Sequence, residues 1–481
     1  MDKYFSKFDI QIYCIVSIFG LISFALMHDV PRSGDEWSYV NAAKGVAEYL
    51  KSLIGLSDTA AVDIRTGLIG YGYFMPGLPI LISPVYLFLG ESAPLVFVRV
   101  YLLLINLSLL VLISKKIGRA LSQKAALINL LICLSIPYYI AFLSAIWSEL
   151  LGLHLAVLFL LHLDEKMQLG RTLSADIAAY WISLLCYIRA IYPSIIFVVL
   201  ASWILAKLQH TSVKLSDCRD IVRRFLVMFL ICAGLLSPWL ISVSELYGPN
   251  FLVTSSGMSH FVHNADEQYV AEAKEAKSGY KGIWSSIHEY ISYRAYDNHI
   301  PFADQLQLDK ERYLVRQSLD ERLKSISAYA KAYFALNSDS ANKFLKRFEK
   351  LSCIGEDCEP NSLFGVAKAI NSFSWPILFI SGAVLFFLPM GVSQSGSYFM
   401  PFMWKGMLFI LFLVPFLSTP HSRYYIQFVP LFGIGIGVLL SGGVRFYWKG
   451  DSFDISNVLV GLGQILAIAM VLITIGILVS F

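Results

Sequence analysis

Long apolar runs separated by short polar segments dominate this chain. About 11 of the runs approach the length of a membrane-spanning helix, which needs roughly 20 apolar residues. They cover Ile10–Met27, Pro94–Ile113, Ala125–Leu143, Trp147–Leu163, Leu173–Tyr187, Ile191–Leu205, Phe225–Val243, Trp375–Met390, Met403–Leu417, Tyr424–Leu440 and Val458–Phe481. The pattern predicts an all-α polytopic membrane protein with about 11 transmembrane helices.

The composition agrees with a membrane environment. Of the 481 residues, 57% are hydrophobic and only 15% are charged, whereas about a quarter of the residues in a soluble domain are charged. The net charge is +4, and the basic residues lie in short clusters between the apolar runs. We therefore expect membrane lipids as partners and no nucleic acid.

The basic clusters predict the orientation of the chain. The run Leu78–Leu89 contains two prolines and is too short to cross, so we interpret it as a re-entrant or interfacial helix. Most clustered basic residues then fall on the side of the N-terminus: Lys115, Lys116, Arg119, Lys124, Lys166, Arg171, Lys207, Lys214, Arg219, Arg223, Arg224, Arg445 and Lys449. By the positive-inside rule, this side is predicted to be cytoplasmic.

This topology predicts three parts. Residues 1–243 form an N-terminal transmembrane catalytic module whose first external loop is 28–77, with juxtamembrane helices. Residues 244–374 form a mainly helical external domain, since Ala303–Leu351 has an amphipathic pattern. Residues 375–481 add the C-terminal transmembrane helices. Cys353 and Cys358 lie close together in the external domain, where an oxidising environment favours a disulfide.

Carboxylates gather at the predicted external ends of the spans. Asp35 and Glu36 follow the first span, and Glu149 follows the turn after the third. An acid at the end of a span is uncommon and often functional. Two alternatives stay open: Asp35 and Glu36 could simply favour a helix N-terminus, and Glu149 could reach interfacial water.

Cations lie at the same predicted membrane edge. They are Arg99, Arg189 and Arg423, with His421 beside the last. Guanidinium is a planar donor of several hydrogen bonds and suits a phosphate group. For each arginine, a structural ion pair or an interfacial anchor is the alternative.

The order of several short motifs resembles the glycosyltransferase C superfamily, nearest its protein O-mannosyltransferase and aminoarabinose transferase branch. The motifs are Gly34-Asp35-Glu36, the segment 72–79, Leu89-Gly90-Glu91-Ser92 with Arg99, Ser148-Glu149, Ser237-Pro238-Trp239 and Arg423-Tyr424. Many relatives have an Arg-Asn pair where this chain has Leu240-Ile241-Ser242, and an Asp at the position of Glu149. These departures leave the acceptor and any metal open.

The resemblance implies a membrane glycosyltransferase of the bacterial inner membrane whose active site faces the periplasm. It would transfer a sugar from a polyprenyl-phosphate-linked donor to a hydroxyl of an acceptor lipid, protein or glycan. Asp35 would be the acid–base residue, while Glu36 and Glu149 would support it or hold a cation. The lipid phosphate would be bound by Arg99, Arg189, His421 and Arg423.

Two further assignments stay open at this point. Asp35 and Glu149 offer hard oxygen ligands that suit Mg²⁺, Mn²⁺ or Ca²⁺, but no spacing motif establishes a metal. His260 and His263 could line the acceptor site, and an ordinary polar loop is the alternative.

Two other functions compete with glycosyl transfer. A transporter or flippase of a lipid-linked sugar would show internal repeats with interrupted helices, and the sequence contains none that we can detect. A polysaccharide polymerase or ligase would share the lipid substrate, but the acidic pair after the first span argues against it.

Overall fold

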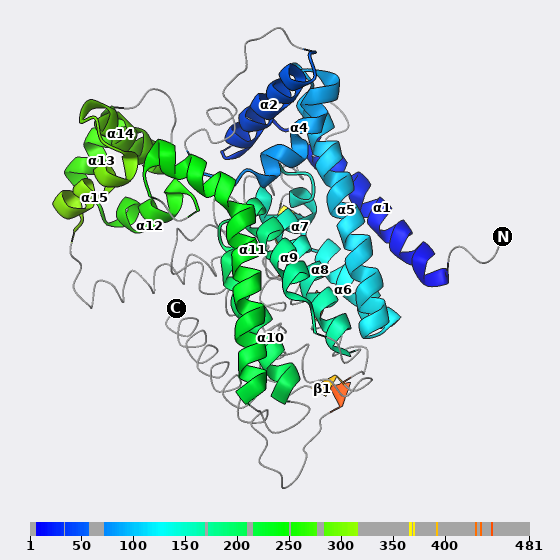
Figure 1. Ribbon diagram of the computed structural model, residues 1–481. Helices are drawn as coiled ribbons and strands as arrows, with labels where there is room; N and C mark the ends of the chain where they lie inside the picture. The colour runs from blue at the N-terminus through cyan, green and yellow to red at the C-terminus, as the bar shows by residue number, and fades with distance from the viewer. Residues whose placement is uncertain are drawn as a thin grey trace, which may run out of the picture.

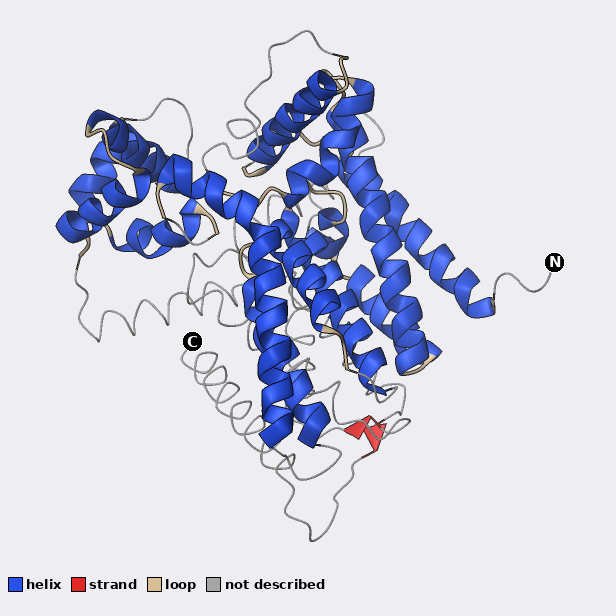
Figure 2. Cartoon of the chain, viewed as in Figure 1, coloured by secondary structure: helices blue, strands red, loops and turns tan. Residues whose placement is uncertain are grey.

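The computed structural model describes most of the first 315 residues. The described ranges are 6–32, 34–56, 72–168, 172–208, 215–249, 252–276 and 283–315, with short pieces at 365–367, 369–370, 391–392, 429–430, 433–434 and 444–445. Within them, helices form nearly all of the regular structure (Figures 1 and 2). The only strands there are β1 (Gly391–Val392) and β2 (Val444–Arg445), which pair antiparallel. The predicted helical class is confirmed for this part of the chain.

Helices of the apolar runs pack into one bundle. They are α1 (Lys7–Met27), α5 (Leu95–Ala120), α6 (Gln123–Leu134), α7 (Pro137–Phe142), α8 (Ser148–Gln168), α9 (Ala175–Ile188), the 3₁₀ helix η1 (Tyr192–Ser194), α10 (Ile195–Leu208) and α11 (Leu215–Tyr247). Among the described helices, α1, α5 and α11 are long and apolar enough to cross a membrane. Apart from residues 429–430 and 433–434, the later predicted spans lie outside the described residues, so the count of about 11 stays a prediction.

The third predicted span differs from the expectation. Ala125–Leu143 is not one helix, because α6 ends at Leu134 and α7 begins at Pro137. Proline lacks a backbone N–H and disfavours helical backbone in the residue before it. Ile136 is accordingly extended, with φ −93° and ψ 110°. The short helix α7 follows the break, and a buried turn after α7 leads into α8.

Charged contacts mark two opposite ends of the bundle. At one end, which we call the Lys115 end, Lys115 pairs with Asp9 at 2.9 Å and Lys116 pairs with Glu165 at 2.6 Å. The other end, which we call the Asp35 end, lies beyond the last residue of α1. This helix has 21 residues, and at about 1.5 Å per residue it separates the two ends by roughly 30 Å. Which end faces the cytoplasm stays a prediction.

Two helices, one amphipathic and one apolar, pack together at the Asp35 end. These are α2 (Glu36–Leu53) and α4 (Gly77–Leu89), the helix that was expected not to cross. The alanines Ala43 and Ala47 of α2 are fully buried in the same apolar cluster as Leu78 and Ile82 of α4. Small side chains allow the two helices to approach closely, and this packing fixes the start of α2 against the bundle.

Four helices beyond α11 form a separate cluster. They are α12 (Thr254–Asn264), α13 (Glu267–Glu275), α14 (Ile283–Asp297) and α15 (Phe302–Tyr313). Figure 1 shows this α12–α15 cluster beside one end of α11, and it has its own apolar core that includes Phe261 and Ile287. The predicted disulfide partners Cys353 and Cys358 lie outside the described residues.

The loop before α4 joins this cluster to the bundle. The backbone N–H of Thr254 donates to the Gly72 carbonyl at 2.8 Å, and the Ser255 hydroxyl donates to the Tyr73 carbonyl at 3.0 Å. Gly72 has φ +62°, and a Cβ there would lie 3.0 Å from side-chain atoms of Tyr247 and Thr254. Glycine meets both the backbone and the space requirement at this junction.

Candidate functional site

A glycine turn places the acidic pair. Gly34 has φ +55°, a conformation that favours glycine, and α2 begins two residues later. Adjacent side chains on a helix point about 100° apart, so the two carboxylates face different surroundings. Glu36 is buried, whereas Asp35 is half-buried. Asp35 makes no capping hydrogen bond to α2, so helix capping does not account for its carboxylate.

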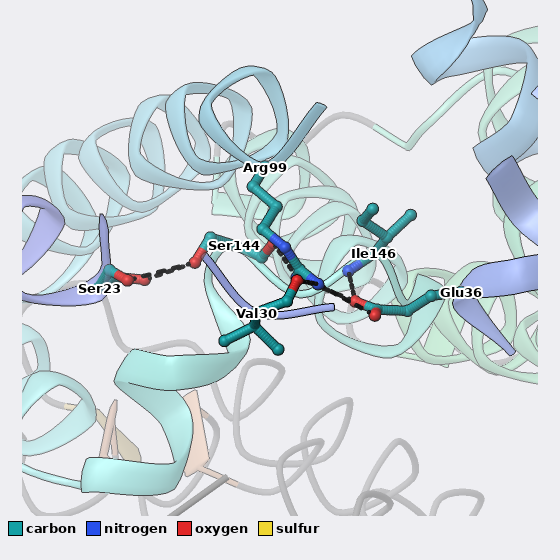
Figure 3. A network of polar contacts seen from close by, with 6 residues as sticks. All are labelled: Ser23, Val30, Glu36, Arg99, Ser144 and Ile146. Carbon is teal, nitrogen blue, oxygen red and sulfur yellow. Dashed lines mark hydrogen bonds and ion pairs between the residues drawn. The ribbon is translucent and has the colours of Figure 1, made fainter. Parts of the chain in front are cut away.

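Glu36 and Arg99 form a closed ion pair inside the bundle (Figure 3). Each side chain is 1% exposed. The two terminal nitrogens of Arg99 donate to the two carboxylate oxygens of Glu36 at 3.0 and 3.1 Å. This bidentate geometry is the strongest form of the contact.

Backbone groups are further partners of this pair, and the buried Nε of Arg99 has no hydrogen-bond partner among the described residues. Arg99 also donates to the Val30 carbonyl at 3.0 Å and to the Ser144 carbonyl at 3.4 Å. The backbone N–H of Ile146 donates to Glu36 at 2.9 Å. Figure 3 shows these partners around the pair: Val30 follows α1, and Ser144 and Ile146 belong to one turn. The pair thus joins α2, α5, the end of the first span and the turn before α8.

A second ion pair lies at the same end of the bundle and is more open. Arg189, directly after α9, approaches Glu149 in the first turn of α8 at 2.9 Å. The Arg189 side chain is 17% exposed, and that of Glu149 is 3% exposed. The same Arg189 nitrogen also donates to the Ser148 hydroxyl at 3.3 Å. Arg189 is therefore partly accessible, unlike Arg99.

Tyr39 connects this open pair to Asp35. Its hydroxyl lies 3.0 Å from the hydroxyl of Ser148, and either can be the donor. Tyr39 is four residues after Asp35 on α2, so both side chains lie on one face of the helix. Asp35, Tyr39, Ser148, Glu149 and Arg189 thus form one polar group, which we call the Asp35 group.

The charges of the Asp35 group act on Tyr39. Burial is the main reason that the pKa of Tyr39 lies well above its ordinary value, and the charges of Glu149 and Asp35 raise it further. The charge of Arg189 lowers the pKa of Tyr39 by a smaller amount. Tyr39 is therefore a neutral hydroxyl at physiological pH, able to donate or accept a hydrogen bond.

The remaining predicted site residues are placed less fully. His260 and His263 lie on α12, and their side chains are outside the described part of the structure. His421 and Arg423 lie outside the described residues altogether. Within the described ranges, no group of three or more His, Cys, Asp or Glu side chains could hold a metal ion.

Three residues with hydroxyl groups lie near the site but were not among the predicted site residues. Tyr39 and Ser148 lie between Asp35 and the open ion pair. The spacing of four residues between Asp35 and Tyr39 on a helix could have indicated Tyr39. Tyr192 is 1% exposed, and its hydroxyl has no hydrogen-bond partner among the described residues. A Cβ added at Gly152, three residues after Glu149, would lie 2.9 Å from this hydroxyl.

The Asp35 group combines the elements that acyl- or glycosyl-transfer chemistry requires. It holds a half-buried carboxylate able to accept a proton, a partly exposed guanidinium able to stabilise an anion, and neutral hydroxyls between them. General acid–base catalysis needs the first, and electrostatic stabilisation of a leaving anion needs the second.

Comparison with known proteins gives distant structural likenesses. No protein-family model and no curated protein matches this chain. It is similar to the oligosaccharyltransferase of Archaeoglobus fulgidus in the apo form, with 13% identity and a TM-score of 0.48 over 97% of this chain and 55% of that one. It is also similar to ArnT from Cupriavidus metallidurans in the apo state, with 10% identity and a TM-score of 0.24 over 90% of this chain and 75% of that one.

This chain spans just over half the length of the oligosaccharyltransferase, 55% of it. Identities this low and TM-scores below 0.5 do not by themselves assign a family.

Proposed function

We propose that this chain is a membrane glycosyltransferase of the glycosyltransferase C type. It transfers a sugar from a polyprenyl-phosphate-linked donor to an acceptor hydroxyl at the non-cytoplasmic face of the membrane. The observation that carries the proposal is the convergence of Asp35, Glu149 and Arg189 around the hydroxyls of Tyr39 and Ser148. The order of sequence motifs resembling that superfamily points the same way.

Asp35 is the base in this proposal. Its carboxylate takes the proton of the acceptor hydroxyl as the acceptor oxygen forms a bond to the anomeric carbon. The bond from that carbon to the phosphate oxygen breaks, and the polyprenyl phosphate leaves with the electron pair. The phosphate is already a good leaving group, so positioning and charge stabilisation are the main tasks of the protein.

Arg189 is the described cation that suits the donor phosphate. It is partly exposed, and its contacts to Glu149 and Ser148 hold the guanidinium at the edge of the Asp35 group. Arg99 is a weaker assignment than the sequence suggested, because its side chain is buried and its two terminal nitrogens already serve Glu36 and two backbone carbonyls. We therefore propose that Arg99 and Glu36 support the site, and that Arg423 and His421 contact the phosphate with Arg189.

The α12–α15 cluster is a reasonable place for the acceptor. Phe74 contacts the ring of Tyr39 at a centroid distance of 4.8 Å, and Tyr73 contacts the ring of His288 at 5.5 Å. Ring contacts therefore connect the Asp35 group to α14, which packs beside α12, the helix that carries His260 and His263. We propose that the acceptor binds between α12 and Asp35.

A transfer assay tests the proposal. The full chain, purified in detergent, is incubated with synthetic polyprenyl-phosphate sugars and with lipid, peptide or glycan acceptors, and both the product and the freed polyprenyl phosphate are measured. We expect release of polyprenyl phosphate that depends on the protein and the acceptor. Chelation with EDTA, followed by added Mg²⁺, Mn²⁺ or Ca²⁺, shows whether transfer needs a divalent cation, for which Asp35 and Glu149 would be the candidate ligands.

One result would overturn this proposal. If the chain released no polyprenyl phosphate but moved a lipid-linked sugar across the bilayer of reconstituted vesicles, the transporter function would be the better account.

A further inference from the structure

A chain of buried polar groups runs through the bundle core beneath the Asp35 end. It contains Tyr139 on α7, His154 on α8 and Asn106 on α5, which are at most 3% exposed. The Tyr139 hydroxyl lies 2.6 Å from His154 Nε2, and His154 Nδ1 lies 3.0 Å from Asn106 Oδ1. Polar side chains inside a membrane bundle are costly and call for a functional reason.

The contact of Asn106 with the backbone determines which atom donates in each of these hydrogen bonds. Asn106 Nδ2 donates to the backbone carbonyl of Leu143 at 2.8 Å, so the Asn106 oxygen must accept from His154. Nδ1 of His154 therefore carries the proton, and Nε2 accepts from the Tyr139 hydroxyl. Each of the three contacts then has one donor and one acceptor. His154 is therefore a neutral histidine in a single tautomer. We call these three side chains the His154 relay.

The relay ends at the turn that builds the site. Ser144 follows Leu143 in this turn. Its carbonyl accepts a hydrogen bond from Arg99, and its hydroxyl lies 3.0 Å from the hydroxyl of Ser23. Ile146 then donates to Glu36. Seven residues separate Arg99 from Asn106, so both lie on one face of α5 and hold consecutive carbonyls of this turn.

The same turn leads into α8. Ser148 and Glu149 are the first two residues of that helix, and both belong to the Asp35 group. A shift of the turn would therefore move the partner hydroxyl of Tyr39 and the carboxylate partner of Arg189 together. Small displacements of catalytic groups cost large factors in rate.

We infer that Asn106 and His154 are positioning residues that hold the turn 143–147, and through it place Ser148 and Glu149 for sugar transfer, an inference whose catalytic part rests on the proposed function. His154 acts here through its hydrogen bonds and exchanges no proton with substrate. A glutamine at this position would retain one donor and one acceptor. This separates a positioning role from proton transfer.

The test combines hydrogen–deuterium exchange with kinetics on the full chain in detergent. His154→Leu and Asn106→Leu should each speed amide exchange in peptides covering 143–149 by about threefold to tenfold, the loss expected for one buried hydrogen bond. They should lower kcat roughly tenfold with the donor KM within about twofold. His154→Gln should restore both quantities. Ser202→Ala is the matched control, because this buried hydroxyl bonds only within α10.

The outcomes are distinct. Unchanged exchange at 143–149 in both leucine variants would overturn the inference, as would faster exchange with an unchanged kcat, or a kcat that His154→Gln fails to restore. If the wild type transfers no sugar while exchange responds as expected, the proposed function fails and the hold of the relay on the turn stands. If the leucine variants do not fold, Tyr139→Phe removes only one donor and should shift exchange and kcat in the same direction by a smaller factor.

Discussion

Two carboxylate–guanidinium pairs lie at the same end of this bundle and differ in what surrounds them. Glu36 and Arg99 are each 1% exposed, and backbone groups supply three further hydrogen bonds to the pair. Arg189 is 17% exposed, and its further contact is a serine hydroxyl that also meets Tyr39. The first pair is closed, whereas the second is open toward Asp35.

The difference shows how burial separates structural from functional charge. A buried pair recovers the cost of desolvation only when its geometry is good and further hydrogen bonds satisfy its polar atoms. In the closed pair these bonds join segments distant in sequence, and the Nε of Arg99 is the atom without a partner among the described residues. An open pair keeps a charged group accessible, so a phosphate can compete for it. Two pairs of the same residue types at one end of the bundle can therefore have different roles, one structural and one in binding a ligand.

Asp35→Asn should have the largest effect on activity. The substitution keeps the shape of the side chain and removes the base, so we expect turnover to fall by a factor of about 10² to 10⁴. Binding of the donor should be nearly unchanged, because the base contacts the acceptor. Single-turnover transfer and donor binding by the same preparation check this. Glu48→Gln, the same type of exchange on α2 at a carboxylate that pairs with Lys51, is the control and should transfer normally. Normal transfer by Asp35→Asn would move the base to another carboxylate.

Arg99→Leu should have the largest effect on stability. It leaves the Glu36 carboxylate buried without its cation, which costs about 3–5 kcal/mol in folding free energy. Arg189→Leu should cost less, because water can reach the edge of that pair. Unfolding in detergent, followed by circular dichroism against denaturant, compares the two variants. An equal loss of stability would mean that the two pairs do not differ as described.

Arg189→Ala should weaken donor binding and turnover together, each by roughly 10-fold to 100-fold. A phosphate contact exists in the bound donor and strengthens as charge develops on the leaving group. Initial rates over a range of donor concentrations separate the two effects. Arg189→Lys keeps the charge without the fork of donors and should recover part of the loss. A normal donor KM in Arg189→Ala would remove Arg189 from the phosphate site.

Tyr39→Phe should have the smallest effect of this series. It removes one hydroxyl from the Asp35 group while leaving the ring and its packing, so we expect a loss of about threefold to tenfold in turnover. Stability should change little, since Ser148 keeps its contact with Arg189. The transfer assay with matched thermal unfolding checks both. A loss as large as that of Asp35→Asn would give Tyr39 a direct part in the reaction.

The helices and the location of the site were largely predictable from sequence. Apolar runs of helical length give the helices up to α11, and the positions of Asp35 and Glu149 after odd-numbered spans place them at one end. The helix break before Pro137 was not predicted, although proline and the residue before it disfavour a helix. The run Ala125–Leu143 is largely apolar, and it was therefore interpreted as one span.

The partners of each charge were not predictable. Glu36 and Arg99 are 63 residues apart in sequence, and no spacing rule links a helix start to the first turns of a later span. The resemblance implied that Arg99 binds the donor phosphate and that Glu36 supports Asp35 or holds a cation, while a structural ion pair stayed open as the alternative for Arg99. Only the packing of α2 and α5 on the turn before α8 indicates that they meet each other.

The most direct measurement is the position of a bound lipid phosphate. A cryo-EM structure of the full chain with undecaprenyl phosphate should place the phosphate at the Asp35 end, within hydrogen-bond distance of Arg189, with the Glu36–Arg99 pair intact. A phosphate bound to Arg99 with that pair broken, or bound at the Lys115 end, would contradict the account.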